Sequence, residues 1–262
     1  MKYQTIKLAI PNGCGLKLAT EIYKPEKDGR LPAVMLFHGF TGYKETADFV
    51  DIADKLARKG IVSIRFTASG FGDSEGTLEQ DYRFSNHRKD AEAVYEYVRK
   101  LPYVDTSRLG VHGHSMGGKL AVLFARDHQN VKVLVVVSAP VTMTATSYGS
   151  HLEEWKSTGY FRKVSGRDGK ELHVPYAYFV DVEGPENDVL IAAAQVTHPQ
   201  SLVMAGDADT EVPWQETHKI YEALTCRKIW KLVKGIPHIY GKYLESRNTV
   251  NTLIMDFCMT NL

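Results

Sequence analysis

A serine stands between two glycines in the segment Gly113-His114-Ser115-Met116-Gly117. The apolar run Leu109–His112 precedes this segment, and a stretch with helical spacing follows it. A serine nucleophile requires such a strand–turn–helix context, because its hydroxyl must project from a sharp, strained turn. The flanking glycines leave space where side chains would collide with the neighbouring strand and helix. The pattern predicts Ser115 as the nucleophile of a hydrolytic reaction, and the alternative is a simple glycine-rich turn.

A serine hydroxyl attacks efficiently only when a neighbouring base takes its proton. Two later loops carry suitable groups: Asp207 and Asp209 lie in the loop 206–213, and His238 lies in the loop 235–238. Both loops follow predicted strands, so we expect them at the carboxyl edge of the sheet, where Ser115 also lies. His238 is the only histidine in such a loop after the acids, and it is the predicted base. These positions leave the orienting acid open between Asp207 and Asp209.

Attack on a carbonyl also requires hydrogen-bond donors for the oxyanion. One donor is expected from the backbone N–H of Met116, which directly follows the nucleophile. The second is expected from the loop His38-Gly39-Phe40-Thr41-Gly42, which follows the first predicted parallel strand, and by position it is the N–H of Phe40. The alternative is that His38 and Gly39 serve simple turn chemistry, which would also explain the glycines.

The elements that must position these residues follow from hydrophobic periodicity. Two alternating segments, Tyr3–Ile10 and Leu16–Tyr23, flank a Pro-Asn-Gly turn and predict an antiparallel hairpin. Six nearly continuous apolar runs are typical of strands covered on both faces: Ala33–Phe37, Ile61–Phe66, Leu109–His112, Val131–Val137, Ser201–Ala205 and Ile229–Val233. Helical spacing separates these runs. The order predicts an α/β fold with a doubly wound, mostly parallel sheet of eight strands.

One region interrupts this alternation. Residues 140–196 are far too many for an ordinary connection between two strands, and they contain a helix-like run at Val189–Val196. The sequence therefore predicts a core of residues 1–139 and 197–262 with an inserted lid at 140–196. Aromatic side chains supply flat apolar area for an aryl group, and the predicted substrate contacts are Trp155, Tyr160, Tyr178, Phe179 and, after the acid loop, Trp214. The alternative is that about half of the lid aromatics form the small core of the insert.

Taken together, these segments are similar to the feruloyl and cinnamoyl esterase group of the α/β-hydrolases. The resemblance spans nearly the whole chain and is carried by HGFTGYKET at 38–46, RFTASGFGDSEG at 65–76, GVHGHSMGG at 110–118, GDADTEVP at 206–213 and GIPHIY at 235–240. It implies the α/β-hydrolase fold and an insert that acts as a lid shaping an aromatic acyl pocket. The pattern G-x-x-D-x-x-V-P of the group places the acid at Asp209 in preference to Asp207, leaving Asp207 and Glu211 as loop-capping or solvated acids.

The chain departs from the group at four positions. Thr67 and Ser69 stand where an acidic residue and an asparagine are usual, Phe71 where a histidine is frequent, and Pro237 where an acidic residue is common. No departure removes Ser115 or its partners. The resemblance therefore implies ester hydrolysis, on hydroxycinnamoyl (feruloyl) esters and, by association with lidded enzymes of this kind, on terephthalate esters or aromatic polyesters.

The amino-acid composition limits the classes of partner that we expect the protein to bind. The 32 basic and 31 acidic residues give a formal net charge of +1, which offers no basic surface for nucleic acid or an anionic membrane. No apolar stretch approaches the ~18 residues of a transmembrane helix. The three cysteines have no metal-binding or disulfide spacing, so we expect no metal, no cofactor and a reducing, cytoplasmic location without a secretory signal. The expected partner is a small-molecule ester, and nothing indicates an oligomeric state.

Two other functions remain open. A short-chain carboxylesterase or monoacylglycerol lipase would use the same three residues with an aliphatic pocket. A binding protein with this fold would have lost them, whereas Ser115, Asp209 and His238 are all present in the expected order. Dehalogenase and epoxide hydrolase chemistry needs an acid at position 115, and dienelactone hydrolase chemistry a cysteine.

Overall fold

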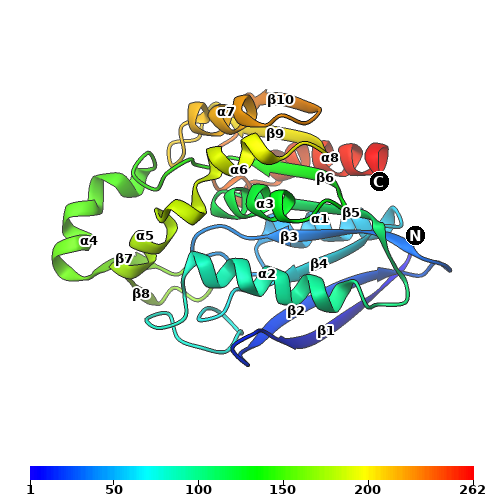
Figure 1. Ribbon diagram of the computed structural model, residues 1–262, viewed down its shortest axis with the longest axis horizontal. Coiled ribbons are helices and arrows are strands. Elements are labelled where there is room, and N and C mark those ends of the chain that lie inside the picture. The colour runs from blue at the N-terminus through cyan, green and yellow to red at the C-terminus, as the bar shows by residue number, and fades with distance from the viewer.

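The computed structural model describes residues 1–262, and one sheet of eight strands runs through its centre (Figure 1). The strand order is β1-β2-β4-β3-β5-β6-β9-β10. β1 and β2 form the antiparallel hairpin, β2 pairs antiparallel with β4, and all later neighbours pair in parallel. The predicted α/β-hydrolase fold with its mostly parallel eight-stranded sheet is confirmed. The strands are β1 (Tyr3–Pro11), β2 (Lys17–Pro25), β3 (Leu31–Phe37), β4 (Val62–Phe66), β5 (Val104–His114), β6 (Val131–Val137), β9 (Gln200–Gly206) and β10 (Lys228–Val233).

The position of each strand in the sheet agrees with its sequence. All residues of β3 and β4 are buried, and only Lys132 of β6 is exposed. These runs of Val, Leu, Ile and Met are covered on both faces, as in parallel sheets generally. The edge strand β1 alternates between more and less buried residues, and β10 at the other edge contains no fully buried residue.

Helices cover both faces of the sheet and enclose two apolar cores (Figure 1). On one face, α1 (Ala47–Arg58) and α8 (Leu244–Asn261) contact each other and bury residues such as Ile52, Leu56 and Ile254. On the other face lie α2 (Phe84–Val98), α3 (Met116–Asp127) and α7 (Trp214–Ala223). None of the helices is long and apolar enough to cross a membrane.

The insert, residues 140–196, lies between β6 and β9 and extends beyond the carboxyl ends of the strands (Figure 1). A two-stranded antiparallel sheet, β7–β8, forms a separate hairpin in it that the sequence did not predict. The predicted helical run at Val189–Val196 corresponds to α6, which packs on α3 and α7 of the core. In chain order, the elements of the insert are η1 (Ser147–His151), α4 (Leu152–Thr158), β7 (Tyr160–Val164), β8 (Glu171–Pro175), α5 (Tyr176–Val182), η2 (Pro185–Asn187) and α6 (Val189–Gln195).

Candidate active site

Ser115 occupies a sharp turn between β5 and α3. Its backbone has φ 56° and ψ −127°, a conformation that a non-glycine residue adopts only under constraint. The chain crowds tightly here: a Cβ on Gly113 would lie 1.9 Å from the carbonyl oxygen of Gly117, and a Cβ on Gly117 would lie 1.9 Å from that of Phe37. The two glycines are therefore required for β5 to turn directly into α3, and the turn projects Ser115 from the carboxyl edge of the sheet.

The structure brings Ser115, His238 and Asp209 together from three separate loops. Nε2 of His238 is 3.0 Å from Oγ of Ser115, and Nδ1 of His238 is 2.8 Å from Oδ2 of Asp209. The ionised carboxylate is an acceptor only, so Nδ1–H donates to it and Nε2 is left to accept the Ser115 proton. The side chains of Ser115 and His238 are almost buried, and that of Asp209 is fully buried.

The two candidate acids have different surroundings. Oδ1 of Asp209 accepts hydrogen bonds from the backbone N–H groups of Glu211 and Val212, at 3.0 and 2.8 Å, which turns Oδ2 toward His238. Asp207 is exposed and accepts from the N–H of Gly235 at 2.5 Å, tying the acid loop to the histidine loop. Asp209, the predicted acid, is therefore the one in contact with His238, and Asp207 lies beside the site as a loop-capping residue.

The backbone N–H groups of Phe40 and Met116 both belong to residues that line the cavity beside Ser115, and neither donates to another group of the protein. Met116 begins α3, so its N–H belongs to the unpaired first turn of a helix. The conformation of the Phe40 loop is held by Thr41, which has φ 53° and donates its N–H to the hydroxyl of Tyr82 at 2.6 Å. Two free donors at one cavity wall are what an oxyanion requires.

The buried side chain of His38 also fixes the conformation of the Phe40 loop. Nε2 of His38 accepts from the N–H of Ala68 at 3.0 Å, and Nδ1 lies 2.9 Å from the carbonyl oxygen of Gly39. This pairing fits only the neutral tautomer with its proton on Nδ1. Burial lowers the pKa of His38 to about 4 and keeps that tautomer. His38 thus cross-links the loops after β3 and β4 without adding charge to the site.

A second histidine lies against the base itself. The ring centroid of His114 is 4.8 Å from that of His238. Burial, assisted by the neighbouring imidazole of His238, lowers the pKa of His114 well below its usual value. His114 consequently stays neutral, so a proton on His238 meets no second positive charge at its face.

A cavity of about 370 Å³ opens beside Ser115 and His238 and is lined by core loops and by the insert. Its size falls in the lower part of the range for small-molecule sites. Phe40, Tyr43 and Tyr148 contribute aromatic side chains to the wall. The insert supplies lining residues between Pro140 and Gly166, so that residues distant in sequence share one wall with the reacting serine.

The five aromatic residues predicted to contact substrate do not line this cavity. Trp155 is buried and donates its indole N–H to the carbonyl of Val174 at 2.9 Å, and Tyr178 stacks on Tyr82 at a centroid distance of 5.1 Å. The rings of Trp155 and Tyr178 both pack against the ring of Phe40. The other three pack elsewhere: Tyr160 on His173, Phe179 on Tyr176, and Trp214 near Trp230 on the core. Packing within the insert and against the core thus takes up Trp155 and Tyr178, which are the two buried members of the set.

Among the cavity residues that sequence reasoning missed are two from the insert, Tyr148 and Lys163. Lys163 lies on β7, two residues after Phe161, whose ring packs against Tyr148 and Trp155. Side chains alternate across a strand, so a strand that turns Phe161 inward also turns Lys163 inward. Recognition of β7 as a strand would have revealed this lysine. Tyr148 lies on a short 3₁₀ helix and carries no comparable signal.

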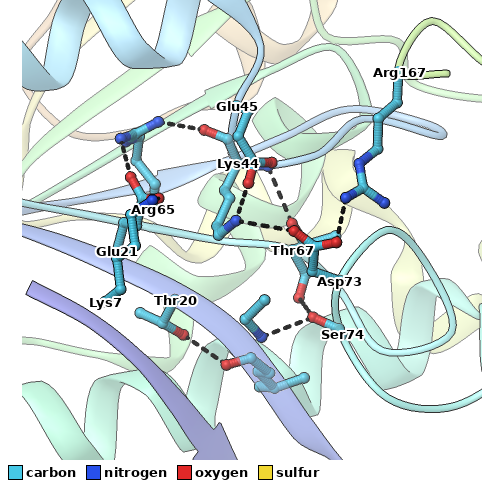
Figure 2. Close-up of polar contacts among 12 residues, drawn as sticks. Lys7, Thr20, Glu21, Lys44, Glu45, Arg65, Thr67, Asp73, Ser74 and Arg167 are labelled. Atoms are coloured by element: carbon cyan, nitrogen blue, oxygen red, sulfur yellow. Dashed lines mark hydrogen bonds and ion pairs between the residues drawn. The ribbon is translucent and has the colours of Figure 1, made fainter.

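The hairpin β7–β8 is attached to the core at its turn, residues 165–170 (Figure 2). Arg167 in this turn forms an ion pair with Asp73 and holds the pKa of that carboxyl below its usual range. Asp73 also lies 3.6 Å from Nζ of Lys44, and the hydroxyl of Tyr43 donates to the carbonyl of Gly166 at 3.1 Å. We call these contacts of Arg167 and Gly166 the hairpin latch.

Lys44 is in turn joined to a buried ion pair of the sheet. Its carbonyl oxygen accepts from Arg65 at 2.5 Å, and Arg65 pairs with Glu21 at 2.6 Å (Figure 2). Arg65 on β4 is almost fully buried, as is Glu21 on β2. The latch is therefore anchored on its core side to a rigid part of the sheet.

Two points of the insert, Val141 near its start and Val182 at the end of α5, meet at a single lysine. Lys119 is buried on α3, four residues after Ser115, and its Nζ donates to the carbonyl oxygens of Val141 and Val182, each at 3.1 Å. Burial lowers the pKa of this amine. Nearby, the N–H of Met143 donates to the carboxylate of Glu183 at 2.7 Å. The chain thus leaves and re-enters the core at neighbouring points of the helix that follows Ser115.

The chemistry available to this site comes from these side chains and backbone groups. No group of three or more His, Cys, Asp and Glu side chains is arranged to hold a metal ion. The three cysteines, Cys14, Cys226 and Cys258, are all free.

A family model described as serine aminopeptidase, S33, matches residues 30–178, which is more than half of the chain. The chain belongs to this family. It is a member of the α/β-hydrolase superfamily, and the matched region includes Ser115 and the loop of Phe40.

Curated relatives of this S33-family hydrolase share part of its length. An uncharacterized protein of Pseudomonas aeruginosa, PA2218, is 30% identical over 55% of this chain and 38% of its own. The uncharacterized Escherichia coli protein YcjY is 33% identical over 49% of this chain and 42% of its own. The mouse sn-1-specific diacylglycerol lipase ABHD11 is 28% identical over 55% of this chain and 45% of its own. The chain thus spans less than half the length of these relatives.

Solved structures match this S33-family hydrolase over nearly its full length. PA2218 of Pseudomonas aeruginosa covers 100% of this chain and 94% of its own with a TM-score of 0.81 and 18% identity. Est1E of Butyrivibrio proteoclasticus, solved with ferulic acid bound, covers 95% of this chain and 99% of its own with a TM-score of 0.72 and 21% identity. At such identities the likeness establishes the fold.

Proposed function

We propose that this protein is a carboxyl-ester hydrolase that works through an acyl-enzyme on Ser115, with a preference for aryl esters. The observation that carries the proposal is the hydrogen-bonded series from Ser115 through His238 to Asp209. A serine hydroxyl 3.0 Å from an imidazole whose other nitrogen faces a buried carboxylate is arranged for general-base activation.

The reaction then has two halves. Nε2 of His238 takes the Ser115 proton as Oγ bonds to the ester carbonyl carbon, and the N–H groups of Phe40 and Met116 stabilise the oxyanion. The imidazolium, stabilised by Asp209, returns the proton to the departing alcohol as the carbon–oxygen bond breaks, leaving an acyl group on Oγ. Water activated by the same imidazole attacks this acyl group, and collapse of the second tetrahedral intermediate releases the acid and restores Ser115.

The aryl preference rests on the cavity wall and on the resemblance to feruloyl and cinnamoyl esterases. Phe40, Tyr43 and Tyr148 supply flat apolar area beside Ser115. Such faces stack on hydroxycinnamoyl groups or on the flat acyl group of a terephthalate ester. A ferulic acid complex of a protein with this fold supports the same assignment.

The second candidate is a short-chain carboxylesterase or acylglycerol lipase, favoured by the similarity to a mouse diacylglycerol lipase. The same three residues would act, and an aliphatic acyl chain would occupy the cavity. The two candidates differ in acyl group and not in mechanism, so substrate selectivity separates them.

The test has two stages. A fluorophosphonate probe should label the wild-type protein and not the Ser115→Ala variant, and absence of labelling would favour a binding protein that has lost its activity. Values of kcat/KM are then measured for methyl ferulate, p-nitrophenyl esters of increasing chain length and an aminoacyl p-nitroanilide. The proposal expects methyl ferulate to exceed the alkyl esters. A steady rise with chain length would favour the lipase, and cleavage of the anilide alone would favour a peptidase.

A further inference from the structure

The cavity contains a cationic side chain that the mechanism above does not use. Lys163 reaches the wall from β7 of the insert, and its Nζ donates a hydrogen bond to the hydroxyl of Tyr148. The same Nζ lies 4.8 Å from the ring centroid of Tyr148 and 5.4 Å from that of Phe40. It therefore lies beside the aromatic rings assigned above to the acyl group, next to the residue that donates to the oxyanion.

Lys163 differs from the inward-facing residues Arg65 and Lys44 in having no carboxylate partner. Arg65 pairs with Glu21, and Lys44 pairs with Glu45 and Asp73, whereas no acidic oxygen lies within 4.0 Å of Nζ of Lys163. One tyrosine hydroxyl accepts only one of its three protons. Burial lowers the pKa of this amine, because removal from water disfavours its charged form. A bound anion would supply the missing partner.

We propose that Lys163 selects ester substrates whose acyl group carries a carboxylate at the end away from the scissile bond, that is, monoesters of dicarboxylic acids. The inference rests on the proposed ester hydrolysis and specifies its substrate class. A carboxylate that reaches Lys163 forms a charge-assisted hydrogen bond in a partly dry cavity, where such bonds are about twice as strong as neutral ones. The aromatic faces of Phe40 and Tyr148 would flank the apolar middle of the same acyl group.

Other charged groups at the cavity constrain this proposal. Glu211 and Asp48 also line it, as does Lys242. Glu211 is close enough to Lys163 to favour its charged form without forming an ion pair, so it would repel an incoming carboxylate. Burial raises the pKa of Asp48 above its usual value. The carboxylate preference should therefore increase when Glu211 is neutralised.

The experiment compares two substrates of equal shape. Monomethyl terephthalate carries the remote carboxylate, and the methyl ester of terephthalamic acid replaces it with a neutral carboxamide. The wild-type protein should favour the acid by about tenfold in kcat/KM, which corresponds to ~1.4 kcal/mol. Lys163→Met should remove this preference, mainly through KM, and Lys163→Arg should keep most of it. Lys156→Met, which changes an exposed lysine of the same insert, should leave both rates unchanged.

Two further measurements keep the outcomes separate. Hydrolysis of p-nitrophenyl acetate reports ester hydrolysis alone: its absence would overturn the proposed function, whereas its presence without a preference for the acid would overturn only the role of Lys163. Glu211→Gln retains Lys163 and should raise the ratio of the two rates above the wild-type value. An unchanged ratio in Lys163→Met, or a ratio lowered in Glu211→Gln, would contradict the proposal.

Discussion

The loops of the core and the insert meet at one cavity but are held by different means. Each core residue of the site has several fixed partners: Asp209 accepts two backbone hydrogen bonds besides that of His238, and His38 binds backbone groups on both sides of its ring. The cavity side of the insert depends on the hairpin latch, where the side chain of Asp73 is half exposed. Exposed ion pairs of this kind contribute about 0–1 kcal/mol.

This difference suits the core loops to the chemical reaction and the insert to the selection of the acyl group. A site that must position a proton between two atoms tolerates little movement, and the core loops restrict movement through buried hydrogen bonds. Selection of an acyl group tolerates more, so a weakly held wall suffices. Under the proposed function, changes in the core should alter the rate on all esters, and changes in the insert should alter the rate on some.

The largest effect is expected in the core. Ser115→Ala should reduce kcat for every ester by a factor of about 10⁴ or more, and His238→Ala should do nearly as much, because these groups act as a unit. Asp209→Asn should cost less than either and far more than Asp207→Asn, the matched control from the same loop. Steady-state kinetics on p-nitrophenyl acetate measure all four. A greater loss in Asp207→Asn would refute the assignment of the acid.

Removal of the outer part of the insert should separate the substrates. Replacing residues 144–181 by a glycine–serine linker keeps α6 and both carbonyls bound to Lys119, and loop length itself changes stability only slowly. The sheet should remain folded, as circular dichroism would show. Hydrolysis of p-nitrophenyl acetate should fall by less than about tenfold and that of methyl ferulate by about a hundredfold, because the insert's side of the cavity wall, with the ring of Tyr148, is lost. Equal losses would mean that the insert only stabilises the core.

A smaller and selective effect is expected from the hairpin latch. Arg167→Gln should reduce kcat/KM for methyl ferulate by about two- to fivefold, with little change for p-nitrophenyl acetate, since an exposed ion pair contributes at most about 1 kcal/mol. Hydrogen exchange in β7 and β8 should become faster. Arg162→Gln is the matched control, because Arg162 is exposed on the same hairpin and its side chain hydrogen-bonds to Tyr160 of the same strand. Faster exchange in the control alone would argue against the latch.

The last expected effect concerns stability in acid and not activity, since buried histidines occur in the core whereas His151 and His173 of the insert are exposed. Burial lowers the pKa of His112 on β5 to about 4. The unfolded chain takes up this proton below about pH 6.5, so the stability contributed by neutral His112 is complete above that pH and is lost as the pH falls toward 4. Between pH 7.5 and pH 5, the free energy of unfolding of His112→Leu should therefore fall by about 2 kcal/mol less than that of the wild-type protein, as measured by denaturant titrations.

The matched control for this experiment is His173→Leu in the insert. Its side chain is half exposed, so substitution should leave the acid dependence of stability as in wild type. If both variants behave like wild type, the core histidines do not limit stability in acid. Should the two variants reduce the dependence equally, burial would not be its cause.

The fold could be predicted because hydrophobic periodicity and turn residues act locally. Every strand of the main sheet coincides with a predicted apolar or alternating run, as Val131–Val137 does without change. The loops of Ser115 and His238 could be placed for the same reason, since residues that follow parallel strands gather at one edge. The meeting of Asp209 with His238 agrees with the family pattern.

The insert could not be predicted in the same way. Aromatic residues such as Trp155 and Tyr178 are typical of an aryl-binding wall, but they are equally typical of a small apolar core. Only the packing of α4 and α5 shows which of the two roles these residues have. Lys163 shows the converse: a charged residue on a five-residue strand gives no hydrophobic signal, although its neighbour Phe161 determines which way it points. The composition of a segment indicates how much apolar surface it buries, but it does not indicate which side chains are left to line the cavity.

The contacts of Lys119 also bear on how this scaffold diversifies. Two carbonyl oxygens bound to one nitrogen are neighbours in space, so the chain between Val141 and Val182 starts and finishes at nearly the same point. Segments with adjacent ends can be lengthened, shortened or exchanged with little disturbance of the framework. A recombination event that replaced this segment would therefore give a new substrate range in one step, provided that position 119 retained a long-chain cation. Chimaeras joined at these two positions are a practical route to new specificities.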